Sequence, residues 1–255
     1  MNTVPDAGRS EADRRPRVLF VPVSGPGGMG EYTRCRIVAD ALRRRRPAVE
    51  TPFVVSRRAP YVADVPEPVI ELPDTPTRES ARMIQWIERL RPDVVVFDNA
   101  GRTAQLRAAR RIGARTVFVS SRPGKRWKAF RWRWLAALDA HWIAYPAFLA
   151  GELSWWERSK LRLRPGVSVT FLGTVFAAPD EARRAGFLRS LGVHDAPYVL
   201  LAPGGGGAHR RGPAAVDAFT RAAGEIVEAT GVTAVLVLGP AHVGELPSIE
   251  GVRVL

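Results

Sequence analysis

Two glycine-rich segments carry the strongest chemical signal in the sequence, because each follows an apolar run and precedes a helical pattern. Residues 24–30 read Ser-Gly-Pro-Gly-Gly-Met-Gly, and residues 204–207 are four consecutive glycines. Between a strand and a helix, glycine lets the backbone approach a ligand closely, and the free amides of the helix N-terminus favour phosphate or another anion. Neither segment has the G-x-G-x-x-G spacing of NAD-binding folds or the lysine of an ATP-binding P-loop. The pattern indicates another phosphate-bearing ligand, with a tight turn that binds nothing as the alternative.

Polar residues also follow two other apolar runs. Asp98 and Asn99 stand where the run 93–98 ends and a helical pattern begins, and a Ser-Ser-Arg triplet ending at Arg122 follows the next run. In open α/β folds, ligands bind outside the carboxyl ends of the strands. Both places are therefore candidate binding sites. The alternative is that these polar side chains only cap the helices that follow them.

Basic and aromatic residues alternate over residues 122–134, where six basic residues are interleaved with three tryptophans and Phe130. Such a segment can lie on an anionic membrane, with indole rings at headgroup depth and cations on lipid phosphates. It can also stack on single-stranded nucleic acid, or bury its aromatic rings and leave the cations in solvent. The residues that we assign to contact with a membrane or another anion are Arg122, Lys125, Arg126, Trp127, Lys128, Arg131 and Trp132.

The net charge indicates which binding partners the protein attracts, and the single cysteine indicates in which cellular compartment it lies. The formal net charge of +13 attracts polyanions, anionic lipids or phosphorylated substrates, although an arginine-rich composition also follows from a GC-rich genome. Cys35 has no partner for an internal disulfide, and residues 1–17 are polar and lack the apolar region of a signal peptide. No apolar run reaches the roughly 20 residues of a membrane-spanning helix. We therefore expect a cytoplasmic protein.

Metal and serine-hydrolase chemistry find no support in the sequence. The four histidines fall on separate predicted elements without the spacing of metal ligands. No nucleophile-elbow motif is present either. We expect neither a metal nor a cofactor.

Apolar runs alternate with helical patterns along most of the chain, which predicts an α/β fold with parallel sheets and helices on both faces. Short runs rich in Val, Ile and Phe are typical of buried parallel strands, and apolar residues at helical spacing mark the helices. The first unit is predicted to have strands at 17–23, 52–56, 93–98, 114–120 and 141–145, and helices at 31–46, 79–90, 103–112 and 128–138.

A second unit begins near residue 180. Its pattern predicts helices at 180–191 and 214–229 and strands at 197–202 and 233–238. We expect a disordered polar lead at 1–16, an N-terminal Rossmann-like domain at 17–153, a junction at 154–179 and a partial C-terminal domain at 180–255. With about 75 residues, the second domain is either unusually small or part of a longer protein.

Both glycine segments lie in stretches that resemble the GT-B glycosyltransferase superfamily. The run Gly28-Met-Gly-Glu-Tyr-Thr-Arg-Cys-Arg-Ile-Val-Ala-Asp-Ala-Leu42 resembles the first glycine loop and helix of two bacterial enzymes. These are the family 28 peptidoglycan N-acetylglucosaminyl-lipid transferase and the UDP-sugar hydrolase of pseudaminic acid synthesis. The run 198–208, Tyr-Val-Leu-Leu-Ala-Pro-Gly-Gly-Gly-Gly-Ala, is similar to the start of the C-terminal domain in the same group. The resemblance implies two Rossmann-like units with parallel sheets.

The resemblance also assigns roles to residues. Where the relatives have histidine after the glycine, this chain has Glu31, which the resemblance places where a general base would accept the proton of an acceptor hydroxyl. The alternative is an acidic residue that only favours the helix N-terminus. The implied acceptor-side residues are Gly28, Gly30, Arg34, Asp98 and Asn99. The implied nucleotide-binding and phosphate-binding residues are Gly204, Gly205, Gly206, Gly207, His209 and Arg210.

The resemblance implies a glycosyltransferase that moves a sugar from a nucleoside diphosphate sugar, a UDP-sugar first of all, to an acceptor hydroxyl, with a lipid-linked acceptor as one option. A peripheral position at the inner face of the membrane would suit such an acceptor. A nucleotide-sugar hydrolase and a non-catalytic binding protein of the same fold are the alternatives. We expect no nucleic-acid partner.

Overall fold

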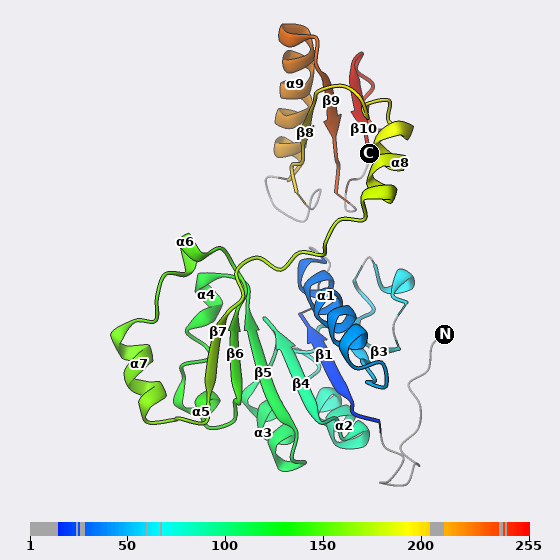
Figure 1. Ribbon diagram of the computed structural model, residues 1–255. Helices are drawn as coiled ribbons and strands as arrows, with labels where there is room; N and C mark the ends of the chain where they lie inside the picture. The colour runs from blue at the N-terminus through cyan, green and yellow to red at the C-terminus, as the bar shows by residue number, and fades with distance from the viewer. Residues whose placement is uncertain are drawn as a thin grey trace. The chain divides into compact units, whose positions relative to one another are not determined.

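The computed structural model of the protein describes residues 15–23, 25, 29–59, 61–66, 68–204, 212–239, 242 and 244–255 (Figure 1). The chain divides into two compact units, Met1–Phe176 and Ala177–Leu255. In the described parts of the chain, no helix has both the length and the apolar character needed to cross a bilayer.

The first unit is built on a sheet of seven strands in the order β3-β2-β1-β4-β5-β6-β7, with every neighbouring pair parallel. From β1 the chain adds β2 and β3 on one side of the sheet. It then returns to the other side of β1 to form β4. This reversal makes a topological switch point between β1 and β4. The strands are β1 (Val18–Pro22), β2 (Phe53–Ser56), β3 (Val69–Leu72), β4 (Val94–Asp98), β5 (Arg115–Ser120), β6 (Ala140–Ile143) and β7 (Ser168–Phe171).

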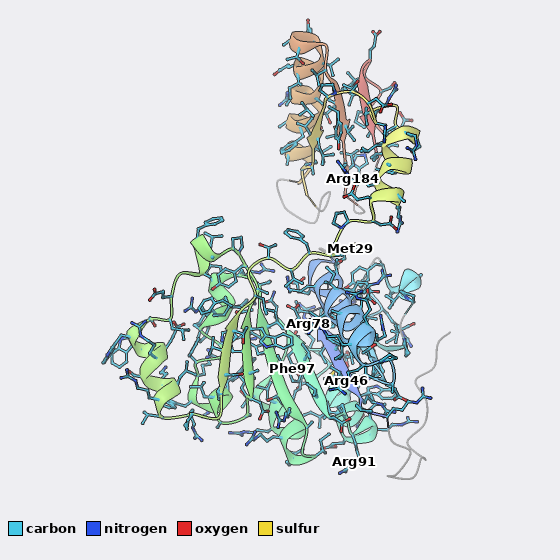
Figure 2. All side chains as sticks on the ribbon, viewed as in Figure 1. Met29, Arg46, Arg78, Arg91, Phe97 and Arg184 are labelled. Carbon is cyan, nitrogen blue, oxygen red and sulfur yellow. The ribbon has the colours of Figure 1, made fainter. Side chains whose placement is uncertain are left out.

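Helices cover both faces of this sheet, and the core is divided accordingly. On one face Cys35 of the first helix packs with Phe20 of β1, and on the other face Met83 and Leu106 of the next two helices pack with Phe97 of β4. Phe97 is fully buried (Figure 2). The period of two along each strand sends alternate side chains to the two faces. The helices are α1 (Gly30–Arg45), α2 (Ser80–Leu90), α3 (Thr103–Arg111), α4 (Pro123–Arg126), α5 (Trp132–Leu135), α6 (Ala147–Ala150) and α7 (Trp155–Arg162), with a 3-10 turn, η2, at Val62–Asp64.

The predicted α/β fold with parallel sheets is confirmed, but three local predictions differ from the structure. The predicted helix at 128–138 is wrong: the chain is extended at Arg131 (φ −70°, ψ 136°), so that a turn and the four-residue α5 replace it. Packing of Phe130 and Trp134 into the core outweighs the local helical spacing. The sequence pattern also missed β3. The stretch 154–179, expected to be a junction, contains α7 and β7, and β7 pairs with β6 in the first sheet.

The second unit has a sheet of three parallel strands in the order β10-β9-β8. One long helix, α9 (Gly212–Thr230), lies between β8 and β9 along the chain and packs Ala223 against Ala234 and Leu236 of β9. The predicted helices and strands of this unit are confirmed within a few residues of their ends. The other elements are α8 (Glu181–Ser190), β8 (Tyr198–Leu201), β9 (Thr233–Leu236) and β10 (Val252–Val254).

Candidate functional site

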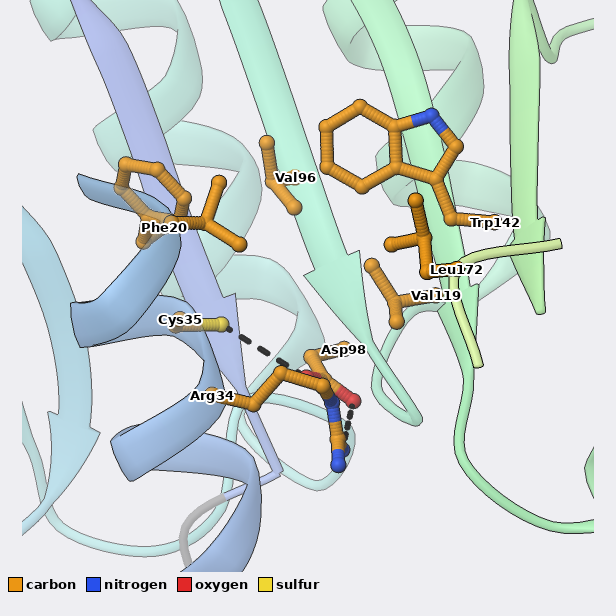
Figure 3. Close-up of a pocket in the computed structure, with 9 residues that line it drawn as sticks. Phe20, Arg34, Cys35, Val96, Asp98, Val119, Trp142 and Leu172 are labelled. Carbon is orange, nitrogen blue, oxygen red and sulfur yellow. Dashed lines mark hydrogen bonds and ion pairs between the residues drawn. The ribbon is translucent and has the colours of Figure 1, made fainter. Parts of the chain in front are cut away.

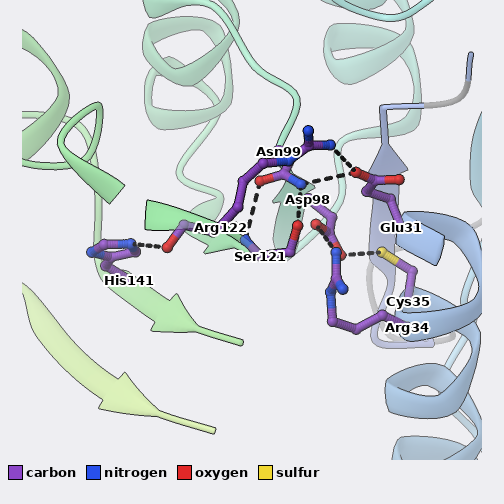
Figure 4. A network of polar contacts seen from close by, with 9 residues as sticks. Glu31, Arg34, Cys35, Asp98, Asn99, Ser121, Arg122 and His141 are labelled. Atoms are coloured by element: carbon purple, nitrogen blue, oxygen red, sulfur yellow. Dashed lines mark hydrogen bonds and ion pairs between the residues drawn. The ribbon is translucent and has the colours of Figure 1, made fainter. Parts of the chain in front are cut away.

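The carboxyl ends of β1, β4 and β5 hold a group of polar side chains in the first unit, which form two hydrogen-bonded sets (Figure 4). The chain leaves β1 toward α1 on one face of the sheet, and it leaves β4 toward α3 on the other face. Ligands of open α/β folds bind where two neighbouring connections diverge in this way. The polar group at this switch point consists of Glu31, Arg34, Cys35, Asp98, Asn99, Ser121 and Arg122.

Arg34 and Asp98 form a two-bond ion pair at the base of this group. The Nε and Nη2 atoms of Arg34 donate to Oδ2 and Oδ1 of Asp98, each over 2.7 Å. The Asp98 carboxylate is fully buried, and the Arg34 side chain is 15% exposed. Burial raises the pKa of Asp98 to about 6 although the guanidinium of Arg34 opposes this shift. The pair thus fixes α1 to β4 at the switch point.

Cys35 lies beside the same carboxylate, with Sγ 3.7 Å from Oδ2 of Asp98 (Figure 3). The two side chains and Arg34 line a hollow of about 10 Å³ that also touches Trp142 and Leu172. A volume of this size admits a single water molecule at most. Burial and the charge of Asp98 raise the pKa of the Cys35 thiol well above its ordinary value. Because the reactive form of cysteine is the thiolate, Cys35 is not a nucleophile at neutral pH.

Asn99 joins the three strand ends through its side-chain amide. Its Nδ2 donates to Oε1 of Glu31 over 2.9 Å and to Oγ of Ser121, while its Oδ1 accepts from the backbone N of Ser121 over 3.2 Å. The backbone of Asn99 is left-handed, with φ of 50°. Asparagine adopts this conformation more readily than most residues. The turn that follows β4 therefore directs this amide toward α1.

Glu31 occupies the first turn of α1, and its side chain is 15% exposed. Besides Asn99, Nη2 of Arg122 lies 3.4 Å from the same Oε1 atom. Within the described part of the chain, no hydrogen bond reaches the other carboxylate oxygen, Oε2. The contacts of the Glu31 carboxylate among the described residues therefore all involve Oε1.

The remaining residues expected around the ligand are Gly30, next to Glu31, Gly204 in the second unit, and six residues outside the described part of the chain. Gly30 is the first residue of α1, and a Cβ atom there would meet nothing within 4 Å. Gly204 follows β8 in the second unit with φ of 96°, a conformation that favours glycine. The expected residues outside the described part of the chain are Gly28, Gly205, Gly206, Gly207, His209 and Arg210.

Arg126 is not the exposed cation that the sequence suggested, because it is only 9% exposed. Its Nε and Nη2 atoms donate to Glu157 over 2.8 and 2.6 Å, and its Nη1 and Nη2 atoms donate to the carbonyls of Ala150 and Glu152. Four of the five N–H donors of this guanidinium are used in these bonds, and its burial keeps it from the surface. Arg126 instead attaches α4 to α7.

Some aromatic residues of the segment 122–134 are buried in the core, and the others lie on the surface. Phe130 and Trp134 are buried, whereas Trp127 is 53% exposed and Trp132 is 48% exposed. The guanidinium of Arg131 lies 3.9 Å from the ring centroid of Trp127. Burial in the core therefore applies to Phe130 and Trp134, whereas Trp127 and Trp132 are exposed as a surface contact would require. Sequence reasoning missed a second set of exposed apolar side chains on α6 and α7, namely Phe148, Leu149, Trp155 and Trp156.

The sequence does contain apolar residues at these positions, but they lack the helical spacing by which an exposed apolar face is recognised. Residues 147–150 are apolar without the spacing of an amphipathic helix, and two tryptophans stand next to each other at 155 and 156. Adjacent residues of a helix point about 100° apart, so both rings are buried only in a wide groove. In the structure both rings are exposed, with centroids 4.3 Å apart.

No known protein family matches the sequence, and no curated protein matches it either. Among solved structures, UGT89C1 of Arabidopsis thaliana complexed with UDP-L-rhamnose is similar with a TM-score of 0.50 and 12% identity, over 95% of this chain and 70% of that one. A putative UDP-N-acetylglucosamine 2-epimerase from Listeria monocytogenes is similar with a TM-score of 0.49 and 15% identity, over 95% of this chain and 69% of that one. A UGT transferase from Siraitia grosvenorii in complex with UDP is similar with a TM-score of 0.48 and 14% identity, over 88% of this chain and 63% of that one.

The similarity to UGT89C1 shows the fold, which is of the GT-B type with a parallel sheet in each of two units. The chain spans between 63% and 70% of the lengths of these three proteins. The narrower resemblance to the family 28 peptidoglycan transferase and the pseudaminic acid hydrolase stays a prediction.

Proposed function

We propose that this protein transfers a sugar from a nucleoside diphosphate sugar, a UDP-sugar first of all, to an acceptor hydroxyl. The observation that carries the proposal is the Glu31 carboxylate, fixed by Asn99 and Arg122 at the switch point of a GT-B-type fold. UGT89C1, which shares this fold, was solved with UDP-L-rhamnose. A carboxylate at the mouth of such a site matches the requirement for a base beside an acceptor hydroxyl.

In the proposed reaction, Oε2 of Glu31 accepts the proton of the acceptor hydroxyl. The hydroxyl oxygen then forms a bond to the anomeric carbon, while the bond from that carbon to the diphosphate breaks and the diphosphate leaves with the electron pair. The Asn99 amide and Arg122 keep Oε1 in place, so that the free oxygen keeps one orientation. The ion pair of Arg34 and Asp98 positions α1, and with it Glu31, against the strand end.

The glycine run 204–207 is our proposed place for the diphosphate. Backbone amides after a strand and before a helix stabilise the charge that develops on a leaving diphosphate. Gly204 follows β8, and α9 begins at Gly212, so the run stands between a strand and a long helix. His209 and Arg210 belong to the same proposal.

Thermal stabilisation tests the donor part of the proposal. A ligand that binds only the native state raises the melting temperature, so UDP, GDP, TDP and their sugar conjugates are added in turn to the purified chain. We expect a clear shift with UDP and its conjugates. No shift with any of these nucleotides would contradict the donor assignment and favour the non-catalytic alternative.

Glu31→Gln tests the catalytic part. The amide keeps the size of the side chain and cannot accept the proton, so we expect transfer to fall by about 10²-fold to 10⁴-fold while the UDP-induced shift persists. Product analysis separates the alternatives, since a hydrolase releases free sugar without acceptor and a transferase places it on the acceptor. Unchanged transfer in Glu31→Gln would rule out Glu31 as the base.

We further propose that the acceptor is lipid-linked and that the aromatic side chains of α4 to α7 contact the membrane. Trp155 is 61% and Trp156 is 67% exposed, and Phe148 is 86% exposed. Lysine and arginine residues lie among these rings, with Nζ of Lys160 5.7 Å from the ring centroid of Trp132. Indole rings next to cations are typical of surfaces that lie on anionic lipids.

Vesicle sedimentation tests this assignment. We expect the chain to sediment with phosphatidylglycerol vesicles and the double variant Trp155→Ser with Trp156→Ser to stay in solution. Phe187→Ser with Leu246→Ser removes two exposed apolar side chains elsewhere and serves as the control, because Phe187 is 52% and Leu246 is 59% exposed. Equal sedimentation of both double variants and the unchanged chain would contradict the assignment.

A further inference from the structure

A groove lined by arginines lies between α3 and α5, away from the polar group at the switch point. It is lined by Arg107, Arg110 and Arg111 on α3, by Arg133 on α5, and by Ala136 and Ala137 after α5. Its volume is about 440 Å³, within the range of small-molecule sites. Because α3 begins after the carboxyl end of β4 and leads back to the start of β5, these arginines lie toward the amino edge of the sheet.

The arginines of the groove are only partly neutralised. Nη1 of Arg110 lies 3.2 Å from Oδ1 of Asp139, and Nη2 of Arg111 lies 2.8 Å from Oε1 of Glu88. The arginine side chains of these pairs are 53% and 63% exposed, so solvent screens the pairs strongly. The carboxylate of Asp139 is shared, since its Oδ2 accepts from the backbone N of Thr116 over 2.7 Å.

Arg107 and Arg133 have no acidic partner among the residues that the structure describes. Arg107 stands three and four residues before Arg110 and Arg111, so the three cations share one face of α3. Like charges at this spacing destabilise a helix. A bound anion would remove that repulsion, whereas the free protein retains it.

Further cations lie near the N-terminal ends of α3 and α5, where Arg102 and Arg131 are the N-cap residues. Burial lowers the pKa of Lys128 to about 8, and the nearby cations Lys125, Arg102 and Arg131 add to this shift. Lys128 Nζ lies 5.0 Å from the ring centroid of Trp134, whose Nε1 donates to Thr103 at the start of α3.

The shape of the groove suits oxyanions of phosphate. A guanidinium presents planar paired donors that match two oxygens of a phosphate group, and four arginines line this groove. The small side chains of Ala136 and Ala137 leave the space between the arginines open.

We propose that this groove is a second binding site, specific for a phosphate-bearing ligand and separate from the site at Glu31. Arg107 and Arg133 supply the unpaired donors, and Arg110 and Arg111 complete the wall. The phosphate belongs either to a soluble phosphorylated molecule or to a lipid headgroup. The site binds without chemistry, because no nucleophile or base lines it.

Calorimetric titration with inorganic pyrophosphate at constant ionic strength tests the proposal. The full chain is compared with the double variant Arg107→Gln with Arg133→Gln and with the control Arg44→Gln with Arg45→Gln. The control removes the same charge from the last turn of α1, on the opposite face of the sheet. We expect about a tenfold or larger loss of affinity in the groove variant and less than about a twofold loss in the control.

A second arm identifies the source of the phosphate. The same variants are sedimented with phosphatidylcholine vesicles that contain phosphatidic acid, with and without pyrophosphate. Loss of pyrophosphate binding in the groove variant, with equal vesicle binding in all chains, supports a soluble ligand. A lipid headgroup is supported if the groove variant no longer binds the vesicles and if pyrophosphate displaces the unchanged chain and the control from them.

The proposal is overturned if the groove variant and the control behave alike in both arms, since any binding is then that of an adventitious ion only. Circular dichroism confirms that each variant is folded. The groove does not depend on the proposed sugar transfer. Glu31→Gln should therefore leave the arginine-dependent binding unchanged even if it abolishes transfer, and the two proposals fail separately.

Discussion

Arg34 on α1 donates two hydrogen bonds to the fully buried Asp98 at the end of β4, across 64 residues of sequence. The contact joins the first helix to the central strand next to the switch point. Removing two charges from water is costly, and the pair repays that cost only while both partners and their geometry persist. The position of Glu31, one turn before Arg34, therefore depends on this buried pair.

Arg34→Ala should lower the free energy of unfolding by about 3–5 kcal/mol, because it leaves the Asp98 carboxylate buried without a partner. Arg34→Ala combined with Asp98→Asn should cost less than the sum of the two single changes. Urea denaturation of the four proteins measures this coupling. A loss below about 1 kcal/mol in Arg34→Ala would mean that the pair contributes little.

Asn99→Gly and Asn99→Ala separate the side chain of Asn99 from its backbone. Both variants lose the amide that holds Glu31, so transfer activity should fall in both. Only alanine opposes the left-handed backbone at φ of 50°, and it should cost about 1–2 kcal/mol of stability. Activity assays beside thermal unfolding check both parts. Full activity in the glycine variant would show that Glu31 does not need this amide.

His141 should make the protein sensitive to acid. Burial lowers its pKa to about 3, its Nε2 lies 2.9 Å from Oγ of Ser120, and its Nδ1 has no partner in the described part of the chain. The unfolded chain takes up this proton near pH 6.5 and the native protein does not, so stability is complete above about pH 6.5 and declines as pH falls.

Between about pH 7 and pH 4.5 this decline amounts to roughly 3 kcal/mol, and His141→Gln should abolish it. Asp98, with its raised pKa, works in the opposite direction, since the native protein holds that proton more tightly as pH falls below about 6. This effect is common to both proteins and cancels when their unfolding free energies are compared. Identical pH profiles for the two proteins would disprove the role of His141.

The sequence allowed the fold to be predicted because the buried parallel strands are short, continuous apolar runs. The run 93–98 is an example, and in the structure its last residue, Asp98, stands at the carboxyl end of β4. The strand β3 escaped prediction because only Val69, Ile70 and Leu72 mark it, with Glu71 among them. An edge strand needs fewer apolar residues than a central one, so its pattern is weaker.

Some residues of the polar group at the switch point were named from the sequence, but their contacts with one another were not predicted. Glu31 and Asn99 were named from two separate motifs, yet their contact depends on how β1 and β4 pair, which no local pattern encodes. Ser121 was only part of a triplet after a strand, and it gained its partner through the left-handed turn at Asn99. Long-range contacts of this kind follow from the sheet order rather than from the spacing of residues.

Arg126 illustrates the same limit and supports a final prediction. In sequence it is one of six basic residues between aromatic rings, but only the fold reveals that Glu157 of α7 accepts two of its hydrogen bonds. Arg126→Ala should cost about 3 kcal/mol of stability, because Glu157 and two backbone carbonyls lose their donor.

Arg131→Ala is the matched control for Arg126→Ala, since Arg131 is exposed and only lies over the ring of Trp127. It should change stability by less than about 0.5 kcal/mol. Thermal unfolding measures both variants, and limited proteolysis should cut the Arg126 variant first near α7, which has lost its attachment to α4. Equal stability of the two variants would mean that the contacts of Arg126 with Glu157 contribute little to the fold.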